Sequence, residues 1–174
     1  SNLFEGYPRL LHIAPEVSLM RHFKRHYRDN ENYITADLES PLADLHFDVQ
    51  NIPLDDESVD VIICNHLLEH VENDRRAMAE LYRILKRGGW GIMLVPEDRT
   101  RATTFEDDTI TDAEERTRIF GQYDHRRIYG RDYDERLSSA GFRVERVAYS
   151  ERLSSELRQC YAIGSDDLVV VYKD

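Results

Sequence analysis

The sequence predicts an α/β protein built on a doubly wound, mostly parallel β-sheet. Short apolar, β-branched runs alternate along the chain with segments of helical periodicity, and turn-forming residues separate the two kinds of segment. A strand joined to the next strand through a helix requires a crossover, so the strands run parallel and helices cover the sheet. A chain of 174 residues is long enough for one real core, and we expect residues 1–174 to form a single domain.

The first half of the chain contains the clearest elements. Val59–Cys64 is an unbroken apolar, β-branched run after a turn-like acidic segment, which predicts a buried strand. Large apolar residues between Val17 and Tyr27 recur at intervals of three or four, which marks one face of a helix. The elements expected here are strands at 10–14, 33–37, 45–49, 59–64 and 90–95, with helices at 17–27 and 73–86.

The second half begins with a charged insertion. From Glu97 to Arg116 there are eight acidic residues and three arginines, with few large apolar side chains, so we expect a lid or substrate loop at about 97–130. A helix at 131–140 and strands at 142–149 and 168–172 are expected after it.

The stretch His66-Leu67-Leu68-Glu69-His70 matches the H-x-x-E-H pattern of a family of zinc peptidases. Two histidines four positions apart face one metal only on an uninterrupted helix. Here the motif starts two residues after a strand and ends before the next helix, so we expect a turn and no metal ligands. A zinc hydrolase acting through His66, Glu69 and His70 is kept as a remote alternative.

Four segments in this order resemble the class I S-adenosylmethionine-dependent methyltransferases, particularly the subgroup that resembles ubiquinone and menaquinone biosynthesis enzymes. The segments are 48–54, 58–65, 68–71 and 80–90, and the whole resemblance spans roughly residues 10–95. It implies a Rossmann-like, seven-stranded, mostly parallel sheet with an antiparallel C-terminal strand. In that family the Leu-Glu-His-Val segment is a turn after the fourth strand.

The resemblance also implies S-adenosylmethionine as cofactor and S-adenosylhomocysteine as product, bound outside the C-terminal ends of the strands. Asp37 follows the second strand, and its carboxylate can accept hydrogen bonds from both ribose hydroxyls. Leu38 would pack on the adenine. The cofactor residues implied by the resemblance are Ala14, Pro15, Glu16, Asp37, Leu38, Asp48, Val49, Asn65, His66 and Leu67.

The first turn departs from the family pattern, which is rich in glycine. Ala14 stands where the first glycine is usual, Pro15 follows, and Glu16 occupies the position of the next glycine. His12 replaces a common acidic residue. Glu16 has two interpretations, which the sequence leaves open: a partner for the cofactor's ammonium group, or an acid favoured at a helix N-terminus.

His66, on the rim, and His125, in the insertion, are the candidate catalytic residues. A general base helps when the methyl acceptor is a hydroxyl or a carbon acid, and imidazole titrates near neutral pH. The alternative is that both histidines are structural or face solvent.

Composition narrows the function class. A net charge of −11 argues against a nucleic-acid partner, and no apolar run suits a membrane span. We therefore expect a cytoplasmic enzyme acting on a small-molecule acceptor, with an oligomeric state that the sequence does not define. The main alternative is a non-catalytic methyltransferase-like module, or a fragment lacking its N-terminal cap, because about nine residues precede the first strand. A nicotinamide enzyme is disfavoured because the first turn lacks G-x-G-x-x-G.

Overall fold

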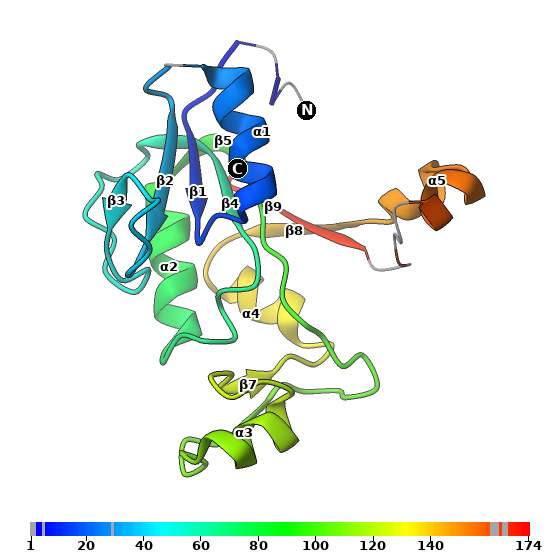
Figure 1. The fold of residues 1–174 in the computed structure, drawn as a ribbon. Helices are drawn as coiled ribbons and strands as arrows, with labels where there is room; N and C mark the ends of the chain where they lie inside the picture. The colour runs from blue at the N-terminus through cyan, green and yellow to red at the C-terminus, as the bar shows by residue number, and fades with distance from the viewer. Residues whose placement is uncertain (1–2, 5, 29, 161–163, 165–166) are drawn as a thin grey trace.

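A seven-stranded sheet forms the centre of the molecule (Figure 1). The computed structural model describes residues 3–4, 6–28, 30–160, 164 and 167–174. The strand order is β3-β2-β1-β4-β5-β9-β8, with β9 antiparallel to both of its neighbours. The strands are β1 (Leu10–Ile13), β2 (Tyr33–Asp37), β3 (Leu45–His46), β4 (Val59–Cys64), β5 (Leu85–Ile92), β8 (Arg143–Val147) and β9 (Leu168–Tyr172). The predicted fold class is confirmed.

Helices cover both faces of the sheet, as the alternating pattern requires. α1 (Val17–Tyr27) buries Met20, Phe23 and Tyr27 against one face. α2 (Asp74–Ile84) and α4 (Tyr133–Ser139) pack on the other, where the larger core cluster lies. Alternate residues of β4 point to the two clusters, so this central strand is buried on both sides. Among the described helices none is long and apolar enough to cross a bilayer.

The junction between α2 and β5 differs from the sequence prediction. The helix was expected to continue to Lys86, but it ends at Ile84, and Leu85 already pairs with Val59 of β4. Gly89 explains why the chain runs so close to β4: a Cβ there would lie 2.9 Å from the carbonyl oxygen of Asp60. The amine of Lys86 instead reaches the carboxylate of Asp60, at 2.8 Å.

The insertion at 97–130 has regular structure of its own. β6 (Phe105–Glu106) pairs antiparallel with β7 (Arg127–Ile128), and α3 (Ala113–Phe120) lies between them in the chain. Figure 1 shows α3 and β7 beyond α4, away from the main sheet. A short 3₁₀ helix (Tyr149–Arg152) and α5 (Ser155–Cys160) come between β8 and β9.

One buried arginine attaches this insertion to the turn after β4. Arg127 is 3% exposed, and its guanidinium donates to the carbonyl oxygens of Leu68 at 2.6 Å, Val71 at 2.7 Å and Glu72 at 3.0 Å. Its Nε donates to Glu106 at 3.1 Å. The turn presents several carbonyl groups without helix or strand partners, and Arg127 satisfies them together.

Asp74, at the start of α2, continues this buried polar network. Its carboxylate accepts from the hydroxyl of Tyr129 at 2.9 Å and from the guanidinium of Arg136 at 2.9 Å. Arg136 also donates to Glu106 at 2.9 Å. The insertion, α2 and α4 are therefore joined through charges that are all paired.

We expect Arg127→Met to lower the free energy of unfolding by about 3 kcal/mol, because it removes one partner of a buried ionic network. Urea denaturation measures this loss. Arg126→Met is the matched control, since the described hydrogen bonds of Arg126 involve its backbone N–H, to the carbonyl of Glu69, rather than its guanidinium. Equal losses in the two variants would contradict the role assigned to Arg127.

Candidate functional site

The C-terminal ends of β1, β2 and β4 surround a small cavity of about 130 Å³. The predicted cofactor residues Ala14, Asp37, Leu38, Asp48, Val49 and Leu67 line it, together with Ile13, Phe47 and Val71. Most of these side chains are apolar, and the two carboxylates stand at its edge. Ligand cavities usually measure about 300–1,000 Å³, so this one is sized for only part of a nucleoside cofactor unless the loops open.

Ala14 has a left-handed backbone conformation, with φ at 47°. Its N–H donates to the carbonyl of Ala36 in β2 at 2.8 Å, which holds the turn against the sheet. Left-handed backbone costs about 1–2 kcal/mol for a residue with a Cβ atom. The turn therefore has the backbone shape that glycine favours, although the residue is alanine.

His12 and Glu16, the two unusual residues of the first turn, bond to each other. The Nε2 atom of His12 lies 2.9 Å from Glu16, and its Nδ1 lies 3.0 Å from the hydroxyl of Tyr33. In neutral His12, donation from Nε2 to the carboxylate leaves Nδ1 to accept from Tyr33. The hydrogen bond from His12 is the main reason why the pKa of Glu16 falls to about 2, with a further contribution from Asn65. Glu16 is thus a pre-oriented anion.

Asn65, directly after β4, completes this rim. Its side-chain amide donates to Glu16 at 3.1 Å. The other side-chain atom, Oδ1, is buried and has no hydrogen-bond donor among the residues that the structure describes. An ionised carboxylate and an unused amide oxygen on neighbouring strand ends favour a cationic ligand group, such as an ammonium. Pro15, between Ala14 and Glu16, is half-buried and lies outside the lining of the cavity.

Asp37 has one committed oxygen and one uncommitted oxygen. Oδ1 accepts from the backbone N–H groups of Glu39 at 2.9 Å and Ser40 at 2.8 Å, which forms the turn after β2. No hydrogen bond within the described ranges uses Oδ2, so this atom can accept from a ligand hydroxyl. Leu38 is 63% exposed beside it, which is unusual for a leucine and suits the face of a base.

Asp48 and Val49 form the opposite wall. Val49 is buried, whereas the carboxylate of Asp48 is exposed and accepts from Gln50, with the side-chain amide at 3.0 and 3.2 Å. A contact between Asp48 and an adenine amine therefore requires the side chain of Gln50 to move aside.

A second cavity, of about 540 Å³, adjoins the rim at His66. Its lining comes from the segments after β4 and β5, from β8 and from the start of β9: His66, Leu94, Val95, Pro96, Glu97, Arg99, Arg146, Asp167, Leu168 and Val169. Two ion pairs join its charged groups, with Arg146 at 2.8 Å from Glu97 and Arg99 at 3.6 Å from Asp167. The side chain of His66 is 59% exposed. Leu67, the next residue, lines the smaller cavity, so the turn after β4 contributes to both cavities.

The structure does not bring the two candidate catalytic histidines to one cavity. His125 is buried, outside the lining of both cavities, and its Nδ1 lies 3.1 Å from the carbonyl oxygen of Phe120. It contacts His70, with ring centroids 4.7 Å apart. The geometry favours His66 as the group nearer to an acceptor.

The H-x-x-E-H stretch lies on a turn, as predicted, rather than on a helix. Glu69 is the unexpected member, because it is 1% exposed and burial raises its pKa to about 7. Nothing in the sequence indicates this burial, because Glu69 follows two leucines in a segment expected to be a surface turn.

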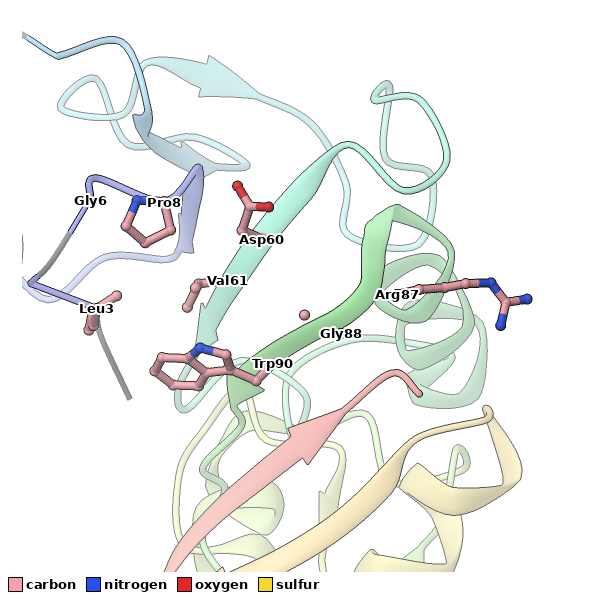
Figure 2. A pocket seen from close by; sticks show the side chains of 9 residues that line it. Leu3, Gly6, Pro8, Asp60, Val61, Arg87, Gly88 and Trp90 are labelled. Carbon is pink, nitrogen blue, oxygen red and sulfur yellow. The ribbon is translucent and has the colours of Figure 1, made fainter.

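A further hollow of about 440 Å³ lies at the opposite, N-terminal ends of β1 and β4 (Figure 2). Trp90, Leu3 and Pro8 line it. Its acidic residue, Asp60, is already bound by the amine of Lys86 and the backbone N–H of Arg9, both at 2.8 Å. Ligands of doubly wound sheets bind at the other edge, so this hollow is not the candidate site.

Comparisons with known proteins concern the family and the fold of the chain. Residues 8–93 match the family model described as a methyltransferase domain. A Mycolicibacterium smegmatis protein named "Probable S-adenosylmethionine-dependent methyltransferase" is 27% identical over 106 residues, which cover 60% of this chain and 37% of that protein. The matched region thus spans a little over a third of that relative.

Two solved structures share the fold. The YcgJ protein from Bacillus subtilis has a TM-score of 0.59 at 14% identity, covering 96% of this chain and 92% of its own. An S-adenosylmethionine-dependent methyltransferase from Archaeoglobus fulgidus has a TM-score of 0.59 at 14% identity, covering 98% and 88%. The chain therefore has the same Rossmann-like fold as these two proteins.

We expect Ala14→Gly to be neutral or to raise the free energy of unfolding by up to about 1 kcal/mol. The substitution removes about 1–2 kcal/mol of left-handed strain and adds about 0.5–1 kcal/mol of chain entropy. Ala79→Gly is the control, because Ala79 is an exposed residue of α2 without a left-handed backbone, and glycine there brings only the entropic loss. Thermal unfolding measures the stability of both variants. If Ala14→Gly loses as much stability as the control, the backbone of Ala14 is not strained.

The pKa of Glu16 predicts an acid-dependent stability. Its folded value of about 2 lies below the ordinary 4.5, so the unfolded chain binds more protons between these pH values. The contribution is complete above pH 4.5 and disappears as pH falls to about 2. Since Glu16 is 41% exposed, we expect less than about 1 kcal/mol.

Urea denaturation at about pH 6, 4 and 3 measures the difference in the free energy of unfolding between wild type and Glu16→Gln. The stability gap between the two should shrink as pH falls. Glu156→Gln, at an exposed position on α5, is the control and should show a constant gap. A constant gap for Glu16→Gln as well would contradict its assigned bond to His12.

Proposed function

We propose that this protein is an S-adenosylmethionine-dependent methyltransferase acting on a small-molecule acceptor, in the subgroup that resembles the ubiquinone and menaquinone biosynthesis enzymes. The observation that carries the proposal is a row of acceptors along one sheet edge. Oδ2 of Asp37 lies at one end, and the ionised carboxylate of Glu16 lies at the other with the buried Oδ1 of Asn65, which has no donor among the described residues. This order of acceptors suits a ribose diol at one end and an ammonium group at the other.

The residues present fit the cofactor. Asp37 would hold the ribose, Leu38 and Val49 would enclose the adenine, and Glu16 with Asn65 would hold the amino-acid part. When bound, S-adenosylmethionine supplies a methyl group on a sulfonium, which is a good leaving group. Much of the acceleration in such a transfer comes from orientation and from exclusion of water, which the walls of the two cavities provide.

The 540 Å³ cavity is the proposed acceptor site. His66, exposed in the lining of this cavity, would take a proton from a hydroxyl or carbon acid, while Glu97 and Arg146 are held in place by their mutual ion pair. We propose residues 1–174 as one domain whose insertion at 97–130 covers the turn after β4. His125, buried in that insertion, is the weaker candidate for a base.

Two alternatives remain. A non-catalytic module of this fold is consistent with the small volume of the first cavity and would bind the cofactor weakly or not at all. A hydrolase using His66, Glu69 and His70 requires the three side chains to share a metal and a scissile substrate. Both alternatives predict no methyl transfer.

We expect S-adenosylhomocysteine to bind with a stoichiometry near one, and Asp37→Asn to weaken it at least about tenfold, or about 1.4 kcal/mol. Asparagine retains the Oδ1 acceptor that forms the turn and replaces only the uncommitted oxygen by a donor, so the fold is preserved. Isothermal titration calorimetry measures both affinities, with S-adenosylmethionine as second ligand.

Asp55→Asn, an exposed acid outside the cavity, is the control and should bind like the wild type. If neither ligand binds the folded wild-type protein, the methyltransferase proposal fails and the non-catalytic module is favoured. Equal affinities for wild type and Asp37→Asn would show that the ribose lies elsewhere.

A further inference from the structure

We propose that Glu69, His70 and His125 form a binding site for a divalent transition-metal ion. The site differs from the literal H-x-x-E-H pattern, because His125 from the insertion takes the place of His66. It also goes beyond the proposed methyl transfer, which requires no metal.

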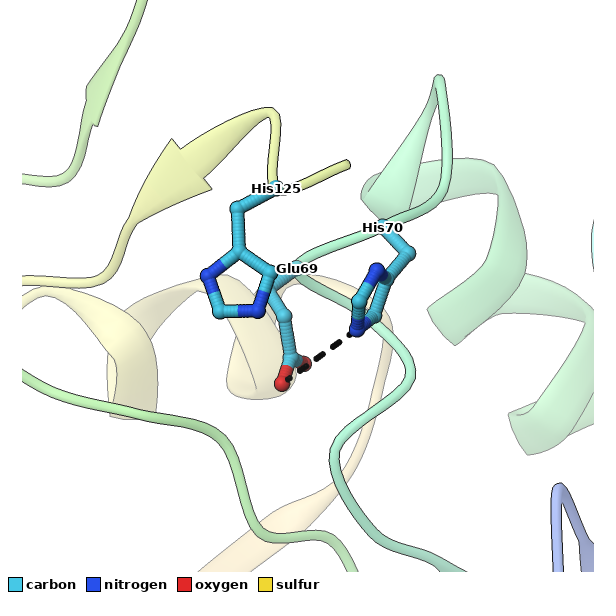
Figure 3. Close-up of side chains that lie close together, drawn as sticks. All are labelled: Glu69, His70 and His125. Atoms are coloured by element: carbon cyan, nitrogen blue, oxygen red, sulfur yellow. Dashed lines mark ion pairs between the residues drawn. The ribbon is translucent and has the colours of Figure 1, made fainter. Parts of the chain in front are cut away.

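The three side chains converge (Figure 3). One ligand atom from each lies within 4.8 Å of the others, and Nε2 of His70 is 4.0 Å from Oε1 of Glu69. A tetrahedral ion with bonds of 2.0–2.1 Å separates its ligands by about 3.4 Å. The present separations between the ligand atoms therefore have to shorten only slightly to reach this value, and rotation of the side chains can achieve it.

Both imidazole rings are oriented by a second partner. Nδ1 of His70 lies 3.2 Å from Asp124, and Nδ1 of His125 lies 3.1 Å from the carbonyl oxygen of Phe120. An acceptor at Nδ1 places the proton there and leaves the lone pair on Nε2, which is the arrangement found behind metal-bound histidines. Figure 3 shows the second ring nitrogen of His125 on the side of the Glu69 carboxylate.

Glu69 is the independent observation that points to a cation. Its side chain is 1% exposed, and both carboxylate oxygens lack a hydrogen-bond donor among the described residues. The nearest basic group apart from the ligands is His66, with Nδ1 at 3.7 Å from Oε1, beyond hydrogen-bond distance. A buried, ionised carboxylate without hydrogen-bond donors is unfavourable, and a cation bound at this position would compensate its charge.

The fold assembles the site from two distant segments. Glu69 and His70 belong to the turn after β4, and the backbone N–H of Arg126 donates to the carbonyl oxygen of Glu69 at 2.9 Å. This bond places the adjacent His125 over the turn. Leu67 and Val71 of the same turn line the smaller cavity, so the metal would lie near the edge of the cofactor site.

Two imidazoles and one carboxylate select a borderline divalent ion such as Zn²⁺, Co²⁺ or Mn²⁺. Three protein ligands leave at least one position open for water or for an oxygen or nitrogen atom of a substrate, as in catalytic rather than structural sites. His70, 26% exposed, marks the side from which such a group enters.

The test uses the whole chain, stripped with a chelator and dialysed, then titrated with Zn²⁺ and with Co²⁺. We expect one ion to bind per chain and the melting temperature to rise with metal. The absorption bands of bound Co²⁺ should be those of an ion with a low coordination number. Glu69→Gln and His125→Gln should each weaken Zn²⁺ binding by more than about tenfold, because each removes a ligand. Asp124→Asn should weaken it by about tenfold through His70.

His46→Gln is the control, since its exposed ring contacts only the carbonyl oxygen of Ser40 among the described hydrogen bonds. Melting curves without metal verify folding, and Glu69→Gln should be at least as stable as wild type because it removes a buried charge. If His125→Gln does not fold, His70→Gln replaces it.

Absence of saturable binding by wild type, or equal binding by wild type and Glu69→Gln, overturns the proposal. Binding lost in His66→Gln but retained in His125→Gln assigns the metal to the literal motif and overturns it as well. Calorimetry with S-adenosylhomocysteine on the same metal-free proteins is a separate readout, so failure of the metal site and failure of the methyltransferase proposal are distinguishable.

Discussion

The buried guanidinium of Arg127 is the interaction on which the candidate site depends. It satisfies the carbonyl oxygens of Leu68, Val71 and Glu72, and so determines the shape of the turn after β4. Leu67 and Val71 of that turn line the cavity at the ends of β1, β2 and β4, and the same turn holds Glu69 and His70. Because Arg127 belongs to the insertion, the same contact brings His125 to the turn. A surface arginine could not do this, since water would compete for its donors.

The first turn shows how a departure from a family pattern is accommodated. Ala14 retains a left-handed backbone, and His12 and Glu16, each unusual alone, form one hydrogen-bonded pair supported by Tyr33. A pre-ionised Glu16 beside Asn65 supplies acceptors at the place where the family has glycine and backbone. The first turn therefore presents an ionised carboxylate that is held by hydrogen bonds from His12 and Asn65.

The sheet edge that carries the candidate site was predictable, because its positions depend on local pattern. Asp37 ends β2, Asn65 and His66 follow β4, and parallel strands end at a common edge. The end of α2 was not predictable from Lys86 and the glycines after it. Close approach to β4 at Gly89 overrode the local helix signals.

The sequence by itself determined the fold class, with helices on both faces of a mostly parallel sheet, and the sheet edge that carries the acceptors. Hydrophobic periodicity and strand ends determine these features, and both are properties of short segments. Only the tertiary structure decided that Glu69 is buried and that His125 joins Glu69 and His70 in one cluster. Those facts depend on an insertion more than fifty residues away in the chain, and it is docked by hydrogen bonds from the buried Arg127 whose geometry no local pattern encodes.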